Sequence, residues 1–235
     1  MKITGNVPIV TLAAELPGAI RVFESLGIDY ACAGDRTLGD AAHVEGIDPE
    51  VIISGLRRLP AAKHGESWSD RPLGDLTRYL VAEHHRLVRE ELAAIAVRLA
   101  DVCTPSALPD LASLRAAFTR MSDIVLPHLH REEANVFLAV EALEGAWQSS
   151  DAFTAEGDLT DAIRQLTVEH GAITAQLRTL RELRVRLDDS SELPQACRPI
   201  LDALAALEAH LHEYMFLENC VLFPRALAME AHAPV

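Results

Sequence analysis

The chain of 235 residues is long enough for one domain, or for one domain with a smaller one beside it, and for a sizeable hydrophobic core. Its formal net charge of -14 argues against nucleic acid and against an anionic membrane surface as partners, because both would repel it. No stretch is long and apolar enough to cross a bilayer, and no signal peptide is evident, so we expect a cytoplasmic protein. The four cysteines are scattered without a Cys-x-x-Cys pair, which indicates reduced thiols and agrees with that location.

Residues 1–60 predict a small helical N-terminal domain of two or three short helices. Each helix carries a recognisable end signal, because Gly27 closes the first while Thr37 and Asp48 cap the second and the third. The predicted helices lie at 18–26, 37–43 and 48–59. The stretch 61–71 follows Pro60, contains Gly65 and small polar residues, and is predicted to be a linker.

The rest of the chain, 72–230, predicts four long helices with short connections. Their expected ranges are 72–101, 109–145, 157–188 and 195–229. Long helices with short connections favour an up-down-up-down four-helix bundle, so the fold class is all-α. Pro127 lies inside the second helix, where we expect it to kink the helix or to widen its turn.

Apolar residues recur every three or four positions along each long helix, which turns one face of each helix into a shared core. The stripe of the first helix begins at Val81, and the stripe of the fourth ends at Val221. Side chains that can bind metal interrupt these stripes, and in chain order they are His85, His128, Glu132, His170, Tyr214 and Glu218.

Buried carboxylates and imidazoles must be neutralised, because an unpaired ionised group in a protein core is costly. Helical bundles hold di-iron and di-manganese centres with inward-pointing sets of this kind. Imidazole and carboxylate together suit iron, whereas structural zinc sites usually contain thiolates. We therefore expect two iron ions bridged by oxide and by the two carboxylates, with a position open to O2, NO or peroxide.

The other histidines rank lower as ligands. His84 and His130 point away from the stripes, and His43 and His64 are expected at the surface. His210 lies one turn before the candidate ligand on the fourth helix, so it is a candidate outer partner of the metal site rather than a ligand.

Several motifs resemble the iron–sulfur cluster repair di-iron (RIC) family. In the bundle the resemblance rests on the segments 128–133, 168–170 and 217–227, which read His-Leu-His-Arg-Glu-Glu, Val-Glu-His and Leu-Glu-Asn-Cys-Val-Leu-Phe-Pro-Arg-Ala-Leu. At the front, Asp-Tyr-Ala-Cys-Ala-Gly-Asp-Arg-Thr-Leu at 29–38 resembles the family's small cysteine-containing domain. The resemblance covers almost the whole chain in the family's domain order.

The resemblance implies a hemerythrin-like bundle with a non-haem di-iron centre. Its ligands would be His85, His128, Glu132, His170, position 214 and Glu218. The family has histidine where this chain has Tyr214, which either ligates iron as a phenolate or forms a hydrogen bond in the core. The family's cysteine pair is reduced to Cys32, which either keeps a thiol function or is an ordinary cysteine.

The activity implied is repair of iron–sulfur clusters damaged by nitrosative or oxidative stress, with damaged iron–sulfur proteins as partners. Two alternatives stay open at this point. One is a hemerythrin-like protein that binds or senses O2 or NO, and the other is a di-iron oxidoreductase that consumes peroxide or NO. The sequence does not decide whether the protein is an enzyme.

Overall fold

A computed structural model of the protein describes residues 2–16, 18–28, 30, 36–59, 68, 71–102, 109–149, 158–191 and 193–232. These residues form helices without any named strand, and a single isolated bridge joins Pro8 to Thr37. The all-α prediction is therefore confirmed. None of the helices in the described ranges is long and apolar enough to span a lipid bilayer.

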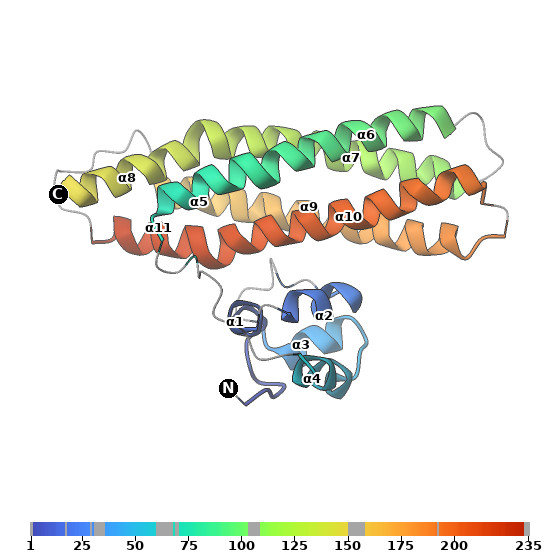
Figure 1. The fold of residues 1–235 in the computed structure, drawn as a ribbon, viewed down its shortest axis with the longest axis horizontal. Helices are drawn as coiled ribbons and strands as arrows, with labels where there is room; N and C mark the ends of the chain where they lie inside the picture. The colour runs from blue at the N-terminus through green and yellow to red at the C-terminus, as the bar shows by residue number, and fades with distance from the viewer. Residues whose placement is uncertain are drawn as a thin grey trace.

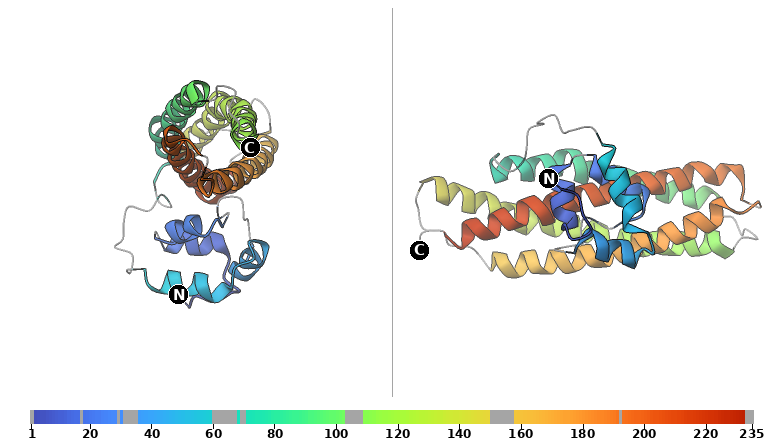
Figure 2. Two further views of the ribbon diagram at one scale, coloured as in Figure 1. Left: turned by 90° about the vertical axis from the view of Figure 1, so that its right-hand side faces the viewer. Right: turned by 90° about the horizontal axis from the view of Figure 1, so that it is seen from below.

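Four long helical rods form the bundle, and they run alternately up and down (Figures 1 and 2). In three of them a wide π turn interrupts the α-helix. The first rod comprises α5 (Leu73–Tyr79), η1 (Leu80–His85) and α6 (Arg86–Val102), and the second comprises α7 (Pro109–Arg131), η2 (Glu132–Val136) and α8 (Phe137–Ser149). The third is α9 (Leu159–Asp188), and the fourth comprises η3 (Gln195–Cys197), α10 (Arg198–Leu217), η4 (Glu218–Leu222) and α11 (Phe223–Glu230).

The π turns shift the buried face by one residue, which corrects two predicted stripe positions. Leu80 is buried in place of Val81, and Leu222 is buried in place of Val221. A π turn contains one residue more than an α turn, so a stripe extrapolated at α-helical spacing is displaced after it. The α-helix also continues through Pro127 without the widened turn that was one of its two expected effects. The wide turn begins only at Glu132.

The described residues of the N-terminal unit form four short helices, so the prediction of two or three was wrong. They are α1 (Ile9–Glu15), α2 (Ala19–Ser25), α3 (Leu38–Val44) and α4 (Pro49–Arg57). The unpredicted helix is α1, which begins after Pro8 without a side-chain cap and so lacks the usual start signal. The expected caps of the later helices are present, since Thr37 accepts from Asp40 N at 3.2 Å and Asp48 accepts from Glu50 N at 3.0 Å.

This unit packs against the side of the bundle formed by α9 and α10 (Figure 2). Tyr30 is fully buried there, with its ring 5.7 Å from that of His212 and 5.8 Å from that of Phe216. Arg181 of α9 donates to the Gly27 carbonyl at 2.7 Å. Aromatic packing and a partly buried backbone acceptor therefore fix the unit against the bundle.

Replacing Gly27 with alanine should destabilise the protein more than the same change at Gly46. Both glycines have positive φ, 71° and 66°, which costs about 1–2 kcal/mol for a residue with a Cβ. A Cβ at Gly27 would also lie 2.4 Å from Nη1 of Arg181 and displace this group from its hydrogen bond to the Gly27 carbonyl, whereas a Cβ at Gly46 meets nothing within 4 Å. The free energy of unfolding in urea measures the difference. Equal losses for Gly27→Ala and Gly46→Ala would show that the Arg181 contact contributes nothing.

Candidate metal centre

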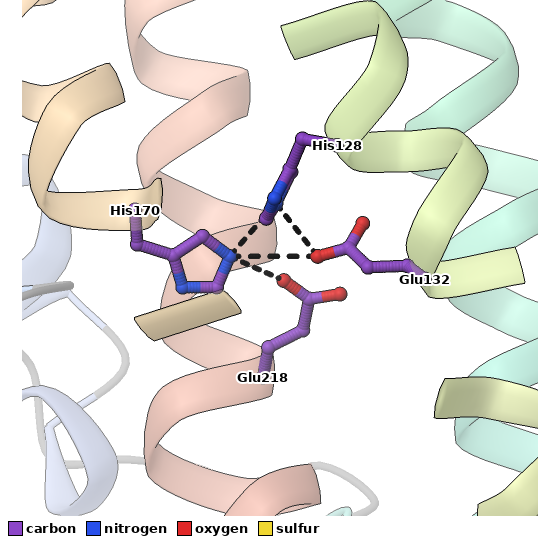
Figure 3. A group of neighbouring side chains, drawn as sticks. All are labelled: His128, Glu132, His170 and Glu218. Carbon is purple, nitrogen blue, oxygen red and sulfur yellow. Dashed lines mark hydrogen bonds and ion pairs between the residues drawn. The ribbon is translucent and has the colours of Figure 1, made fainter. Parts of the chain in front are cut away.

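Four buried side chains converge in the middle of the bundle (Figure 3). His128 and Glu132 come from the second rod, His170 comes from α9, and Glu218 comes from the fourth rod. One potential ligand atom from each lies within 4.8 Å of all the others, and all four residues are fully buried. Spacing of four residues places His128 and Glu132 one turn apart on one helix face.

Glu132 lies at the centre of this group and also reaches His85. Its Oε1 lies 2.7 Å from Nε2 of His128 and 3.5 Å from Nε2 of His170. Its Oε2 lies 3.4 Å from Nε2 of His85, which comes from η1 and is fully buried. Glu218 Oε2 lies 3.3 Å from Nε2 of His170. The two oxygens of Glu132 thus face different imidazoles.

Tyr214 is buried beside the same cluster. Its ring centroid lies 5.7 Å from that of His85 and 6.3 Å from that of His170. The structure therefore brings together all six residues that the sequence singled out for the metal site. Their assignment as ligands remains a prediction.

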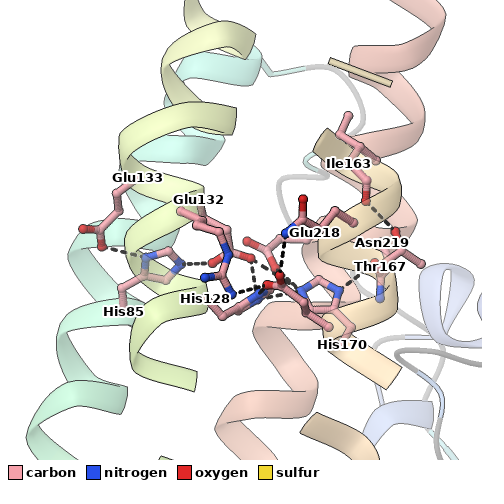
Figure 4. A network of polar contacts seen from close by, with 12 residues as sticks. His85, His128, Glu132, Glu133, Ile163, Thr167, His170, Glu218 and Asn219 are labelled. Atoms are coloured by element: carbon pink, nitrogen blue, oxygen red, sulfur yellow. Dashed lines mark hydrogen bonds and ion pairs between the residues drawn. The ribbon is translucent and has the colours of Figure 1, made fainter. Parts of the chain in front are cut away.

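Each of the three clustered histidines is held from outside by a residue of another helix, and Figure 4 shows this for His85 and His170. His85 Nδ1 pairs with Glu133 at 2.8 Å, and His128 Nδ1 pairs with Glu169 at 2.8 Å. His170 Nδ1 pairs with Asn219 Oδ1 at 2.9 Å. An acceptor at Nδ1 places the ring proton there and turns the Nε2 lone pair toward the cluster.

Arginines support the two carboxylates among these outer partners. Arg89 donates to Glu133 at 2.8 Å, and Arg131 donates to Glu169 at 2.8 Å. Partial burial opposes ionisation, but the arginine and histidine bonds hold the pKa of both carboxyls below the usual range. The outer carboxylates are therefore ionised acceptors for the imidazole N–H groups.

Sequence reasoning missed these outer partners, although a signal was present. Glu133 follows Glu132, Glu169 precedes His170, and Asn219 follows Glu218. A helical neighbour lies about 100° around the axis, so it faces the adjacent helix when the clustered residue faces the core. His210 was the predicted outer partner; in the described contacts it instead pairs with Glu91 of α6 at 2.9 Å.

The remaining candidates lie outside the cluster. His84 is buried but contacts the ring of Tyr79, with 5.3 Å between the ring centroids, and His43 and His130 are exposed. Cys32 and His64 lie outside the described residues.

The clustered groups shift each other's protonation. Burial opposes ionisation of Glu132, but His128 and the other imidazoles hold the pKa of Glu132 well below its usual value. Burial and the charge of Glu132 raise the pKa of Glu218 well above its usual value. Burial lowers the pKa of His170, yet hydrogen bonds to Glu132 and Glu218 outweigh it and raise that pKa to about 10. Without a metal, a proton on His170 is thus the local counter-charge.

A cation fits this donor set better than a proton does. The carboxylates of Glu132 and Glu218 are fully buried, and their described ion-pair partners are imidazole Nε2 atoms, which donate a hydrogen bond only while they are protonated. Inward-facing Nε2 lone pairs and carboxylate oxygens repel one another unless a positive ion lies between them. The arrangement is therefore that of a candidate metal site in a helical bundle, with nitrogen and oxygen donors.

Comparison with known proteins assigns the family. The profile of the hemerythrin HHE cation-binding domain matches residues 76–226, and a profile named ScdA_N, a domain of unknown function (DUF542), matches residues 5–60. The first match covers more than half of the chain, so the protein belongs to the hemerythrin HHE cation-binding family. The N-terminal match and the relatives below confirm the resemblance to the iron–sulfur cluster repair family.

Similar proteins match the chain over nearly its full length. The iron–sulfur cluster repair protein ScdA of Staphylococcus haemolyticus (strain JCSC1435) is 27% identical over 227 residues, which cover 94% of this chain and 98% of the relative. The iron–sulfur cluster repair proteins YtfE of Yersinia pseudotuberculosis serotype IB (strain PB1/+) and of Yersinia pestis (strain Pestoides F) are each 24% identical over 235 residues, which cover 96% of this chain and 98% of the relative.

Metal binding should release protons at neutral pH. The pKa of about 10 keeps His170 protonated at pH 7 without metal, and a histidine ligand must be neutral. The affinity for ferrous iron should therefore rise from pH 6 to pH 8, by about tenfold per pH unit for each proton released. Anaerobic titration with ferrous iron in weak buffer measures both the affinity and the number of protons released. His43→Asn, which changes an exposed histidine, should keep the same profile, and a pH-independent affinity of the unaltered protein would contradict the prediction.

Proposed function

We propose that the cluster holds two iron ions. Since Glu132 Oε1 faces His128 and His170 while Oε2 faces His85, its carboxylate spans two adjacent positions. His128 and His170 would serve one iron, and His85 would serve the other, with Glu132 and Glu218 shared between them. This division of the imidazoles around one carboxylate is the observation that carries the proposal.

Tyr214 would complete the position at His85. Its ring is fully buried and lies nearer to the ring of His85 than to that of His170. A phenolate is an anionic, hard donor and favours ferric iron over ferrous iron. We therefore expect a lower reduction potential, and weaker reversible O2 binding, than a histidine at this position would give.

The function that this site supports best is repair of iron–sulfur clusters after nitrosative or oxidative damage. The curated relatives named as repair proteins align with both the N-terminal unit and the bundle. Residues 1–60 would form one domain, 61–71 a linker and 72–230 the metal-binding bundle. Bound iron would supply the metal for rebuilding a cluster and an open position for NO, O2 or peroxide.

The protein itself would hold the iron, keep water out and set the donor strength. Full burial of the clustered residues excludes solvent from the centre. The Glu133 and Glu169 carboxylates fix the rings of His85 and His128 and increase their basicity. The client would be a damaged iron–sulfur protein.

The purified iron-loaded protein should restore activity to an iron–sulfur dehydratase inactivated by peroxide. It should contain about two irons per chain, as the two positions around Glu132 require. The metal-free protein should restore none, and Glu132→Gln should lose most of the iron and most of the repair.

Other results would assign a different function to the same centre. Reversible spectra with NO or O2, without repair, would indicate a gas-binding protein. Catalytic loss of peroxide or NO, again without repair, would indicate an oxidoreductase. Iron well below one per chain would contradict the di-iron proposal itself.

The iron-loaded ferric protein should show a visible phenolate-to-iron charge-transfer band. Tyr214→Phe keeps the buried ring but removes the donor oxygen, so the band should disappear while most of the iron stays bound. Tyr79→Phe is the matched control, because Tyr79 contacts His84 rather than a clustered residue, and it should keep the band. Persistence of the band in Tyr214→Phe would exclude Tyr214 as a ligand.

A further inference from the structure

A surface cleft of about 320 Å³ opens between the α5–η1 segment and the η2–α8 segment. Its apolar lining includes Val81, Phe137 and Leu138. Leu138 lies at the surface and is 58% exposed, whereas Phe137 is only 3% exposed. The cleft thus runs from an exposed rim to a buried aromatic floor.

The floor of this cleft contacts the proposed metal site directly. The ring of Phe137 stacks on that of His85, with centroids 5.5 Å apart and planes at 28°. Glu133, which also lines the cleft, holds Nδ1 of His85 at 2.8 Å. The ring of Phe137 therefore separates the cleft from the imidazole of His85.

The stacking of a second phenylalanine on His170 provides a comparison for the stacking of Phe137 on His85. Phe223 follows its π turn as Phe137 follows η2, and it stacks on His170 with centroids 6.0 Å apart and planes at 10°. Phe223 does not line this cleft. The two phenylalanines thus make equivalent contacts with ligand imidazoles, but only Phe137 borders the opening.

The polar lining restricts what can pass through the cleft. Glu141 accepts from the Thr77 hydroxyl at 2.7 Å, and Glu133 accepts from Arg89 at 2.8 Å as well as pairing with His85. The carboxylates are already engaged by donors, which leaves them poorly suited to strip water from a cation. The lining contains two carboxylates and one cationic side chain, Arg78, so its net negative charge also disfavours an anion.

We propose that this cleft is the entry route for small uncharged ligands of the iron centre, of the class of NO and O2, and that Phe137 is the barrier they pass. The inference rests on the proposed di-iron site but not on the repair function. Motion of one side chain would open the path, so the barrier would act on the rate of ligand entry rather than on affinity.

The test is the association and dissociation of NO with the anaerobic diferrous protein, followed by absorbance in stopped flow. Phe137→Ala should raise both rate constants by at least about threefold, because the barrier side chain is removed. Leu138→Trp adds bulk at the exposed rim without disturbing the core, and it should lower both rate constants. The NO dissociation constant should change by less than about twofold in Leu138→Trp, since a route alters the two rates together.

Phe223→Ala is the matched control, because it removes an equivalent ring from His170 but leaves the cleft intact. Its NO rate constants should remain within about twofold of the original. Equal effects of Phe137→Ala and Phe223→Ala, or unchanged rates in Leu138→Trp, would overturn the entry route. A protein that follows the expected rates but fails to repair clusters would retain the route and lose the proposed function, whereas a chain that takes up no iron would overturn both.

Discussion

The structure depends on the balance of charge among five fully buried polar side chains. Glu132, Glu218 and three imidazoles occupy positions in the bundle that otherwise hold aliphatic residues. Without metal, a proton on His170 balances only part of this charge, and the described ion-pair partners of both carboxylates are imidazoles, which donate a hydrogen bond only while they are protonated. Such a cluster destabilises a core unless a cation joins its members, so metal binding and stability of the bundle are coupled.

The surrounding helices are adapted to this cluster in a repeated way. The second and fourth rods each place a π turn at the clustered glutamate, beginning at Glu132 and at Glu218, and a phenylalanine follows each turn. The added residue lets that phenylalanine stack on a clustered imidazole of another helix. π turns of this kind are frequent at functional sites, where they are retained despite poorer hydrogen-bond geometry.

The two halves of the centre nevertheless differ. Carboxylates support His85 and His128, whereas the neutral amide of Asn219 supports His170. The ring of Tyr214 lies nearer to His85 than to His170, and the cleft behind Phe137 approaches the same side. If Tyr214 ligates iron as proposed, donor strength and ligand access would coincide at one of the two proposed iron positions, where an anionic oxygen would stabilise the higher oxidation state.

Periodicity alone determined the all-α class, the four long helices and the six residues that converge, because each inward group interrupts an apolar stripe. It could not reveal the π turns, since a stripe read at α-helical spacing misplaces Val81 and Val221 by one residue. The uncapped α1 had no start signal and was missed. Only the tertiary structure decided the pairings between helices, such as Glu169 with His128 and His210 with Glu91. These pairings depend on which helices are neighbours and on how each is rotated about its axis, and the sequence pattern of a single helix contains neither.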